Sequence, residues 1–311
     1  MNKFIVRLFF FTLTAAFAGE IIIRAFKLTP EIPERYTDKS GIQRYKHNQS
    51  GYYTKARSKW VVNDFGWLGV SDTTKDIRVS IIGDSYIENI MNPISCNQGS
   101  ILKSYFPNVS FFEAGRSGVS FIEAMEISKI LDSEISPRIH LLYLSNKDFY
   151  ESISTIARYE NVVQIDLPNK RILKTDLGLS KIKKLLYSSK LLYYLYLRFP
   201  IFVSKQNLGE VSGSSESKAG FDDSTFTSLF EYCSRNYNSE RIVFVFHPGI
   251  QKQFILLSEK YHFKTISLNS DGDKSWVMTS NDDHWSCYGH NQVAKQIKMH
   301  LLEFLHPVIE P

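Results

Sequence analysis

The segment "IRVSIIGDSYIEN", residues 77–89, decides the fold class of this 311-residue chain. Its first part, residues 77–82, is a short and mostly apolar run of the kind that forms a buried strand. The run stops abruptly at Gly83, Asp84 and Ser85. Such an ending is either an ordinary turn or the place where a sheet holds a serine at its edge for chemistry.

Four more strand-like runs follow, and helical patterns lie between them. The expected strands cover 77–82, 109–114, 139–144, 241–246 and 263–268. Ser120 and Glu123 form a capping-box pattern at the start of one helix. Apolar residues at helical spacing between Val293 and Phe304 mark a closing helix. Strands that alternate with helices predict an α/β fold in which helices cover both faces of a parallel sheet.

Composition excludes several classes of protein. The chain is 43% hydrophobic and 22% charged, as a globular protein is, and its net charge is +5. Its Lys and Arg residues are scattered, so no nucleic-acid partner is expected. Cys96, Cys233 and Cys287 lack CxxC and Cys/His metal spacing, and no metal or other cofactor is predicted. An odd number of cysteines argues against a disulfide framework, although one bridge remains open if the chain is exported.

The first 27 residues differ from the rest of the chain. Lys3 and Arg7 precede an apolar run of about a dozen residues, and an A-x-A cleavage pattern follows at 16–18, as in a signal peptide. If Glu20 is tolerated near the interface, 8–23 would instead be a short uncleaved membrane anchor. A buried N-terminal helix is the third interpretation. Both export interpretations place the body of the protein outside the cytoplasm, as a membrane-anchored extracytoplasmic domain or as a periplasmic or secreted protein.

The remaining chain divides into a lead-in segment at 28–75 and a main domain at 76–306. The main domain contains an insertion at roughly 150–236. Its aromatic patch "SKIKKLLYSSKLLYYLYLRFPIF" at 180–202 predicts a helical cap over the sheet, and contact with a membrane surface is the alternative. Four tyrosines of this patch either stack on a sugar or pack in a core: Tyr187, Tyr193, Tyr194 and Tyr196.

Polar residues follow three of the predicted strands. They lie at 83–85, 115–118 and 145–148. Since ligands of open α/β sheets bind beyond the carboxyl ends of the strands, these residues are expected to line one crevice. A nucleophilic serine there needs a base and an acid that orients the base. His284, which has Asp282 and Asp283 immediately before it, can supply both from one loop.

The order of these residues resembles that of one known family. This chain resembles the SGNH, or GDSL, hydrolase superfamily in the order of four motifs: Gly83-Asp84-Ser85, Gly118, Asn146 near Asp148, and Asp282-x-His284. The resemblance covers roughly 55–150 and 238–306. The apolar start and "VNDFGWLG" at 62–69 resemble the exported and membrane-anchored members. The family resemblance implies a three-layer flavodoxin-like fold and a serine esterase.

The resemblance also implies a role for each residue. Ser85 attacks the ester carbonyl, His284 takes the serine proton, and Asp282 holds the imidazole. The backbone N–H groups of Ser85 and Gly118 and the side-chain amide of Asn146 form the oxyanion hole, which stabilises charge that develops in the transition state. No metal and no other cofactor takes part.

Two departures from the family pattern leave alternatives open. Lys147 separates Asn146 from Asp148, so alignment on Asp148 puts lysine where asparagine is expected; Asn146 is the preferred donor. The acid is either Asp282, which the family's spacing favours, or its neighbour Asp283. Four other histidines are interpreted as structural: His140, His247, His262 and His290. Of these, His247 also ends a predicted strand.

The leading hypothesis is an exported serine esterase that hydrolyses acyl esters, with acetyl groups on glycans as the favoured substrate. An O-acyltransferase that acts on a cell-surface polysaccharide is the first alternative, because it uses the same triad. A non-catalytic binding or assembly protein of the envelope is the second. Intact Ser85, Asp282 and His284 argue against the second alternative, and Lys147 is the feature in its favour.

Overall fold

The computed structural model describes residues 2–54, 57–159, 161–174, 177, 188–199 and 222–309. The chain forms two compact units. The anchor unit comprises 1–32, 52–57 and 178–221. The sheet unit comprises 33–51, 58–177 and 222–311.

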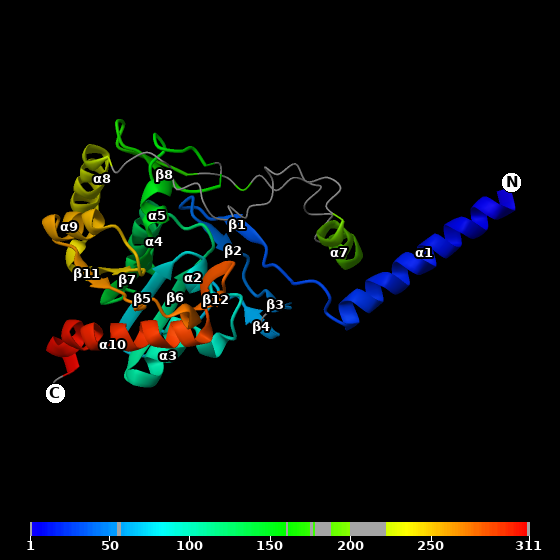
Figure 1. Ribbon diagram of the computed structural model, residues 1–311, viewed down its shortest axis with the longest axis horizontal. Helices are drawn as coiled ribbons and strands as arrows, with labels where there is room; N and C mark the ends of the chain where they lie inside the picture. The colour runs from blue at the N-terminus through cyan, green and yellow to red at the C-terminus, as the bar shows by residue number, and fades with distance from the viewer. Residues whose placement is uncertain are drawn as a thin grey trace. The chain divides into compact units, whose positions relative to one another are not determined.

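A five-stranded parallel sheet forms the centre of the sheet unit (Figure 1). Its strands, in spatial order, are β11 (Lys264–Ser267), β10 (Ile242–Phe246), β7 (Ile139–Leu144), β5 (Ile77–Gly83) and β6 (Val109–Gly115). Read from β6, this is the strand order of flavodoxin-like folds. The switch point, where ligands of such sheets bind, lies beyond the carboxyl ends of β5 and β7.

Successive residues of the central strands face opposite helical layers. Val79 and Ile81 of β5 point into a core that they share with α3 (Gln98–Tyr105) and α10 (Cys287–Ile309). On the other face lie α4 (Phe121–Glu134), α5 (Asn146–Glu151), α8 (Asp223–Asn236) and α9 (Lys252–Lys260). Ring contacts on this second face build an aromatic core of Phe121, Phe149, Phe226, Phe230, Phe244 and Phe254.

Short strands and helices accompany the central sheet. The two-stranded sheets are β1 (Arg35–Thr37) with β2 (Gln43–Tyr45), β3 (Ser50–Tyr53) with β4 (Ser58–Val61), β8 (Gln164–Asp166) with β9 (Arg171–Leu173), and β12 (Val277–Thr279) with β13 (Asp282–Trp285). The short helices are α2 (Ser85–Glu88), η1 (Ile94–Cys96), η2 (Ser239–Arg241) and η3 (Lys274–Trp276). Isolated bridges join Leu68 to Gly115 and Ser71 to Phe112, so part of the lead-in segment lies along the outer edge of β6.

The predicted fold class is confirmed, and each predicted strand agrees with the observed one to within one residue at either end. The capping box at the start of α4 is only half formed. Ser120 Oγ accepts the Glu123 N–H at 3.3 Å, but the Glu123 carboxylate pairs with Arg116 at 2.6 Å. Because both members of that pair are buried, the guanidinium requires this counter-charge, and the requirement overrides the local sequence pattern.

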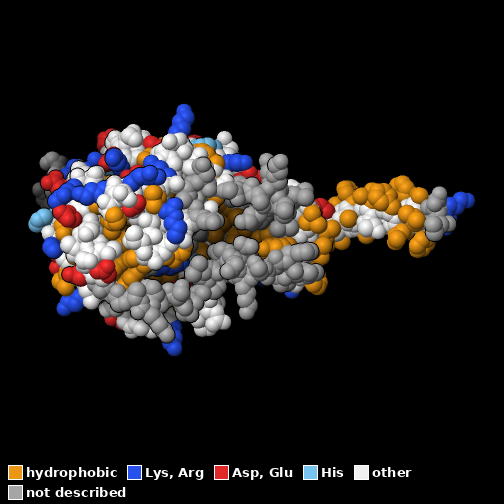
Figure 2. Space-filling model, turned by 90° about the horizontal axis from the view of Figure 1, so that it is seen from above, with side chains coloured by type: hydrophobic (Ala, Val, Ile, Leu, Met, Phe, Trp, Pro, Cys, Tyr) orange, Lys and Arg blue, Asp and Glu red, His pale blue; other side chains and the backbone are white. Residues whose placement is uncertain are grey.

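The anchor unit contains α1 (Asn2–Ala25) and α7 (Lys190–Arg198). From Lys3 to Ala25, α1 is long and apolar enough to cross a membrane, judged by length and composition. Most of its apolar side chains are exposed, as Figure 2 shows, and Ile23 is buried. The helix runs unbroken through the A-x-A pattern at 16–18. It is compatible with both the signal-peptide and the anchor interpretation.

The insertion expected as one helical cap is divided in the structure. The β8–β9 hairpin and α8 belong to the sheet unit, and α8 buries Phe226 and Phe230. Helix α7 belongs to the anchor unit and carries Tyr193, Tyr194 and Tyr196. Tyr187 and much of the aromatic patch lie outside the described residues.

Candidate active site

Ser85 is the first residue of α2 and lies directly beyond the carboxyl end of β5. Asp84 caps this helix, because its carboxylate accepts the Tyr86 N–H at 3.0 Å. The first N–H groups of a helix have no partner within the helix. The Ser85 N–H is therefore available as the donor that an oxyanion hole needs.

Two glycines allow α2 to pack closely on the ends of β5 and β6. A Cβ added at Gly83 would lie 2.6 Å from Ile87 Cγ1. A Cβ added at Gly115 would lie 2.3 Å from the Glu88 backbone nitrogen. Any larger residue at either position would push the helix, and Ser85 with it, away from the sheet.

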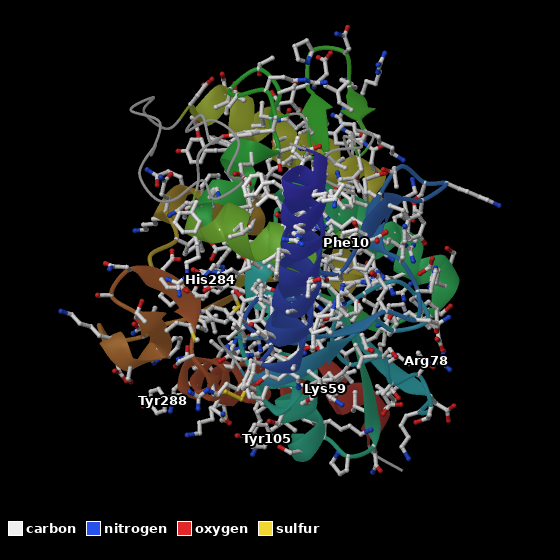
Figure 3. The ribbon with its side chains drawn as sticks, turned by 90° about the vertical axis from the view of Figure 1, so that its right-hand side faces the viewer. Phe10, Lys59, Arg78, Tyr105, His284 and Tyr288 are labelled. Carbon is white, nitrogen blue, oxygen red and sulfur yellow. A yellow bond between two sulfur atoms is a disulfide. The ribbon has the colours of Figure 1, made fainter. Side chains whose placement is uncertain are left out.

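His284 and Asp282 reach Ser85 from the β12–β13 ribbon, which precedes α10. Figure 3 labels His284. Alternate residues of a strand face the same side, so Asp282 and His284 point together. His284 Nδ1 lies 2.7 Å from an Asp282 carboxylate oxygen, and His284 Nε2 lies 2.8 Å from Ser85 Oγ. The structure brings the three predicted residues into one hydrogen-bonded chain, in which Asp282 and not Asp283 contacts the imidazole. The side chains of His284 and Asp282 are 26% and 32% exposed, so water reaches the site.

A second hydrogen-bonded Ser-His-Asp set lies inside the sheet unit. Ser80 Oγ is 2.7 Å from His140 Nδ1, and His140 Nε2 is 3.1 Å from an Asp132 carboxylate oxygen. Ser80 is fully buried in the middle of β5, where no substrate can reach its hydroxyl. Position at the end of the strand, and not the hydrogen-bond distances alone, therefore distinguishes Ser85 as a candidate nucleophile.

Gly118 lies in the turn after β6 at φ +78°, a backbone conformation that favours glycine. Its neighbour Ser117 is held by Glu88: the Ser117 N–H donates to a Glu88 carboxylate oxygen at 3.1 Å, and the Ser117 hydroxyl donates to the same oxygen. Glu88 is the last residue of α2, and Ser85 is the first. One short helix therefore fixes both the candidate nucleophile and the turn that carries the second expected oxyanion donor.

Asn146, the first residue of α5, is bound to the loop after β10. Its Nδ2 donates to the Gly249 carbonyl at 3.0 Å, and its Oδ1 accepts the Gln251 N–H at 2.8 Å. A side-chain amide has two N–H donors, so one stays available for a ligand. The Lys147 side chain is 58% exposed, and its ammonium pairs with Glu151 at 3.3 Å. Asn146 is thus fixed at the strand end, whereas Lys147 extends toward solvent.

The carboxyl groups of Asp84 and Asp148 have raised pKa values. Burial raises the pKa of Asp84 to about 6, against its hydrogen bond with the Tyr86 N–H, which lowers it. Burial, followed by the charge of Asp84, raises the pKa of Asp148 well above its usual range. Burial therefore works against a negative charge on both of these carboxyl groups.

Tyr86, the residue after the candidate nucleophile, packs against the ring of His284. Its ring centroid lies 5.1 Å from that of His284, 4.9 Å from that of Trp285 and 4.4 Å from that of His247. Its hydroxyl donates to the Asp283 carbonyl at 3.2 Å. Burial raises the pKa of Tyr86 and lowers the pKa of His247 to about 3, so both rings stay neutral at physiological pH. Tyr86 therefore joins the helix of the serine to the strand of the histidine.

A disulfide between Cys96 and Cys287 joins η1 to the start of α10, three residues after His284. The three cysteines of the sequence allow one disulfide in an exported chain, and this is that disulfide. Cys233 is a free thiol, buried in α8. The bridge ties the segment that carries His284 to the part of the chain that follows α2.

Sequence reasoning missed the residues that hold the site together. The carboxylate of Glu88 accepts the Tyr45 hydroxyl and lies 3.9 Å from the Arg35 guanidinium, and both partners come from the lead-in segment. Arg35 also donates to the Ser117 carbonyl at 3.3 Å. Tyr86 and Glu88 both lie in the stretch that follows Ser85. A charged residue within a buried helical turn was the signal that could have identified Glu88.

Replacement Tyr86→Phe tests the link to Asp283. It removes the hydroxyl and keeps the ring, so we expect kcat for an aryl ester to fall about 3- to 10-fold with KM nearly unchanged, as for the loss of one hydrogen bond. Steady-state kinetics measures the effect. Tyr288→Phe, at an exposed tyrosine of α10, is the matched control and should leave kcat unchanged. A Tyr86→Phe enzyme with full kcat would contradict the role of this hydroxyl.

The disulfide predicts a loss of stability when it is removed. Cys96→Ser opens a link between residues 191 positions apart, and we expect the midpoint of thermal unfolding to fall by roughly 5–15 °C. Calorimetry on the full chain with and without dithiothreitol measures this. The reductant should have no further effect on the Cys96→Ser, Cys287→Ser double variant. Equal melting of reduced and oxidised parent protein would show that the bridge does not form.

The fold and the site define an α/β protein with a hydrogen-bonded serine, histidine and aspartate at the switch point of a flavodoxin-like sheet. No family model and no curated protein matches the chain. Solved structures similar to it include TesA, at 9% identity and TM-score 0.40, covering 75% of this chain and 99% of that one. Another is the psychrotrophic esterase EstA from Pseudoalteromonas sp., at 12% identity and TM-score 0.40, covering 74% and 100%. A third is a lipolytic protein of the G-D-S-L family from Veillonella parvula, at 11% identity and TM-score 0.36, covering 75% and 98%.

Proposed function

We propose that this protein is an exported serine ester hydrolase of the SGNH/GDSL type that acts on small-molecule or glycan acyl esters. Acetyl esters on glycans are the favoured substrates. The observation that carries this proposal is the hydrogen-bonded chain from Asp282 through His284 to Ser85, at the carboxyl end of a parallel strand. The Ser80–His140–Asp132 set has similar distances, but the Ser80 hydroxyl is fully buried and no substrate can reach it.

The geometry supports a two-step acyl transfer. Asp282 accepts the Nδ1–H of His284, which leaves Nε2 free to take the Ser85 proton as Oγ forms a bond to the ester carbonyl carbon. His284 then gives that proton to the leaving alkoxide, and an acyl-serine remains. Water attacks the acyl-serine with His284 as base, and the acid and free Ser85 are released. The N–H groups of Ser85 and Gly118 and the Asn146 amide stabilise the oxyanion in both steps.

Two observations support export, with α1 as the segment that enters the membrane. Helix α1 is apolar over a length that can cross a bilayer. The Cys96–Cys287 disulfide is of a kind that persists in oxidising compartments outside the cytoplasm. Export with the sheet unit on the outer side of the membrane accounts for both. Cleavage at the A-x-A pattern would give a periplasmic or secreted form of the same enzyme.

An O-acyltransferase remains the alternative, because both reactions pass through the same acyl-serine. The two differ in whether water or a sugar hydroxyl attacks that intermediate. The partial exposure of His284 and Asp282 gives water access and favours hydrolysis. A non-catalytic binding role is disfavoured by the intact geometry around Ser85.

The test is a partition experiment. The full chain is incubated with an aryl acetate, with and without free glycans, and both acetate and acetylated glycan are quantified. We expect steady release of acetate, with most of the acyl group still reaching water when glycan is present. Acetylated glycan in proportion to donor consumed, with little free acetate, would replace the hydrolase by the transferase. No consumption of any ester would favour the non-catalytic role.

A further inference from the structure

Glu20 is a charged residue within the apolar helix α1, and its carboxylate is bound by the start of α7. Its carboxylate accepts the backbone N–H of Lys190 at 3.0 Å, the N–H of Leu191 at 2.7 Å and the Ser189 hydroxyl at 3.1 Å. It also pairs with Arg24 at 2.6 Å. The first N–H groups of a helix lack partners within the helix and favour a negative charge. Glu20 therefore caps α7 and ties its first turn to α1.

These contacts fix the level of α7 along α1. Glu20 lies five residues before Ala25, the end of the apolar segment, which corresponds to about 7.5 Å along the helix axis. The first turn of α7 also packs closely at this level, since a Cβ at Gly19 would lie 3.3 Å from Leu191 Cδ1. If α1 crosses a bilayer, α7 begins at the boundary between hydrocarbon and head groups.

Helix α7 presents an apolar face that the protein leaves exposed. Leu192 and Leu195 of α7 and the C-cap residue Phe199 are three to four residues apart along this side of the helix, and they are 44%, 40% and 60% exposed. Tyr193, which is buried, projects about 100° away from Leu192, and Leu197, which is 47% exposed, lies opposite Leu195. A contiguous exposed apolar face of this kind marks a surface that meets lipid or a partner.

The chemistry around this face is that of a membrane interface. The chain that leaves α1 exposes Phe26 and Leu28, at 73% and 45%. Basic and aromatic residues accompany these apolar side chains: Arg24, Lys27, Tyr194, Tyr196 and Arg198. Tyrosines at head-group level and Lys or Arg beside an apolar face are typical of helices that lie in the interface of anionic membranes.

We propose that α7 is an interfacial helix, which lies in the surface of the membrane that α1 crosses and buries Leu192, Leu195 and Phe199 in lipid. This inference rests on the anchored form of the proposed function. The anchor unit then contacts the bilayer twice, through a span and through a helix in the plane of its outer surface. Glu20 is a structural bridge between these two contacts, which explains a carboxylate near the end of an otherwise apolar helix.

The test uses the full chain in vesicles of phosphatidylcholine and phosphatidylglycerol. Leu195→Cys is labelled with an environment-sensitive fluorophore, and doxyl groups on the lipid chains serve as quenchers. Phe11→Cys in α1 is the positive control for the span, and Glu259→Cys, exposed on α9 of the sheet unit, is the control for water. The unsubstituted chain gives the background from Cys233, which is buried.

We expect the label at position 195 to emit at shorter wavelength and to be quenched about threefold more strongly than the label at 259. Glu20→Ala should reduce this quenching, whereas Glu20→Gln, which keeps an acceptor oxygen, should retain most of it. A label at 195 that behaves like the one at 259, while the label at 11 is quenched, overturns the inference. Equal quenching of the Glu20→Ala and parent chains would overturn the bridging role of Glu20.

The same vesicles separate this inference from the proposed enzyme activity. Quenching at 195 together with no ester hydrolysis would refute the esterase and leave the interfacial helix standing. Hydrolysis without quenching at 195 would do the reverse. If the label at 11 is also unquenched, the membrane span fails, and the interfacial helix fails with it.

Discussion

Replacement of Ser85 by alanine is expected to abolish covalent labelling by a fluorophosphonate and to lower turnover of an aryl ester by about 10³-fold or more. The reason is that Ser85 Oγ, 2.8 Å from His284 Nε2, is the atom that forms the acyl bond in the proposed reaction. Without it, only unassisted attack by water remains. Intact-mass analysis of the labelled chain and steady-state kinetics give the two measurements.

The chain supplies a matched control for this experiment in Ser80. It is the buried serine of the Ser80–His140–Asp132 set, whose hydrogen bonds resemble those of the candidate site. Ser80→Ala should leave labelling stoichiometric and turnover within a fewfold of the parent, because its hydroxyl never meets substrate. Labelling that survives Ser85→Ala, or that Ser80→Ala removes, would move the nucleophile elsewhere and refute the assignment.

The second large loss of turnover is expected when Asp282, the residue that orients His284, is replaced. Asp282→Asn removes the negative charge that stabilises the imidazolium and the oxygen that fixes the Nδ1–H tautomer, so turnover should fall by about 10²- to 10⁴-fold, close to the loss in His284→Ala. Asp283→Asn should cost less than about threefold, as a surface substitution does, because its side chain is exposed and Tyr86 binds its backbone carbonyl. Kinetics of the three variants at one pH measures the order.

The reverse order of the two asparagine variants would contradict the geometry of β13. Asp282 and His284 share one face of the strand, and Asp283 could orient the imidazole only if the ribbon were turned over. Near-UV circular dichroism of each variant separates a lost charge from a misfolded ribbon, since Trp285 is buried next to the exchanged residues.

Much of the fold and the core of the candidate site could be predicted because they depend on local patterns. The five strands are short apolar runs, and their burial on both faces follows from a parallel sheet. Ser85, Gly118 and Asn146 each follow a strand, so their common edge follows from the topology. Asp282 and His284 are two residues apart, a spacing that places both on one side of a strand.

What could not be predicted depends on contacts between segments far apart in the chain. The hydroxyl of Tyr86 meets a carbonyl 197 positions away, and Glu88 is satisfied by Tyr45, 43 positions before it. The insertion was expected to act as one cap, but α8 belongs to the sheet unit and α7 belongs to the anchor unit with α1. No local period in the sequence specifies which distant partner satisfies a buried polar group or covers an apolar face.

The sequence by itself therefore determined the α/β class, the strands, and the serine and histidine of the hydrogen-bonded set. Hydrophobic periodicity and strand-end chemistry are properties of neighbouring residues, and they can be read in one dimension. Tertiary structure alone decided between Asp282 and Asp283, paired Cys96 with Cys287, and placed Glu20 on the first turn of α7. Each of these depends on the direction and distance of side chains brought together by folding, because hydrogen bonds and disulfides form only within narrow limits of geometry.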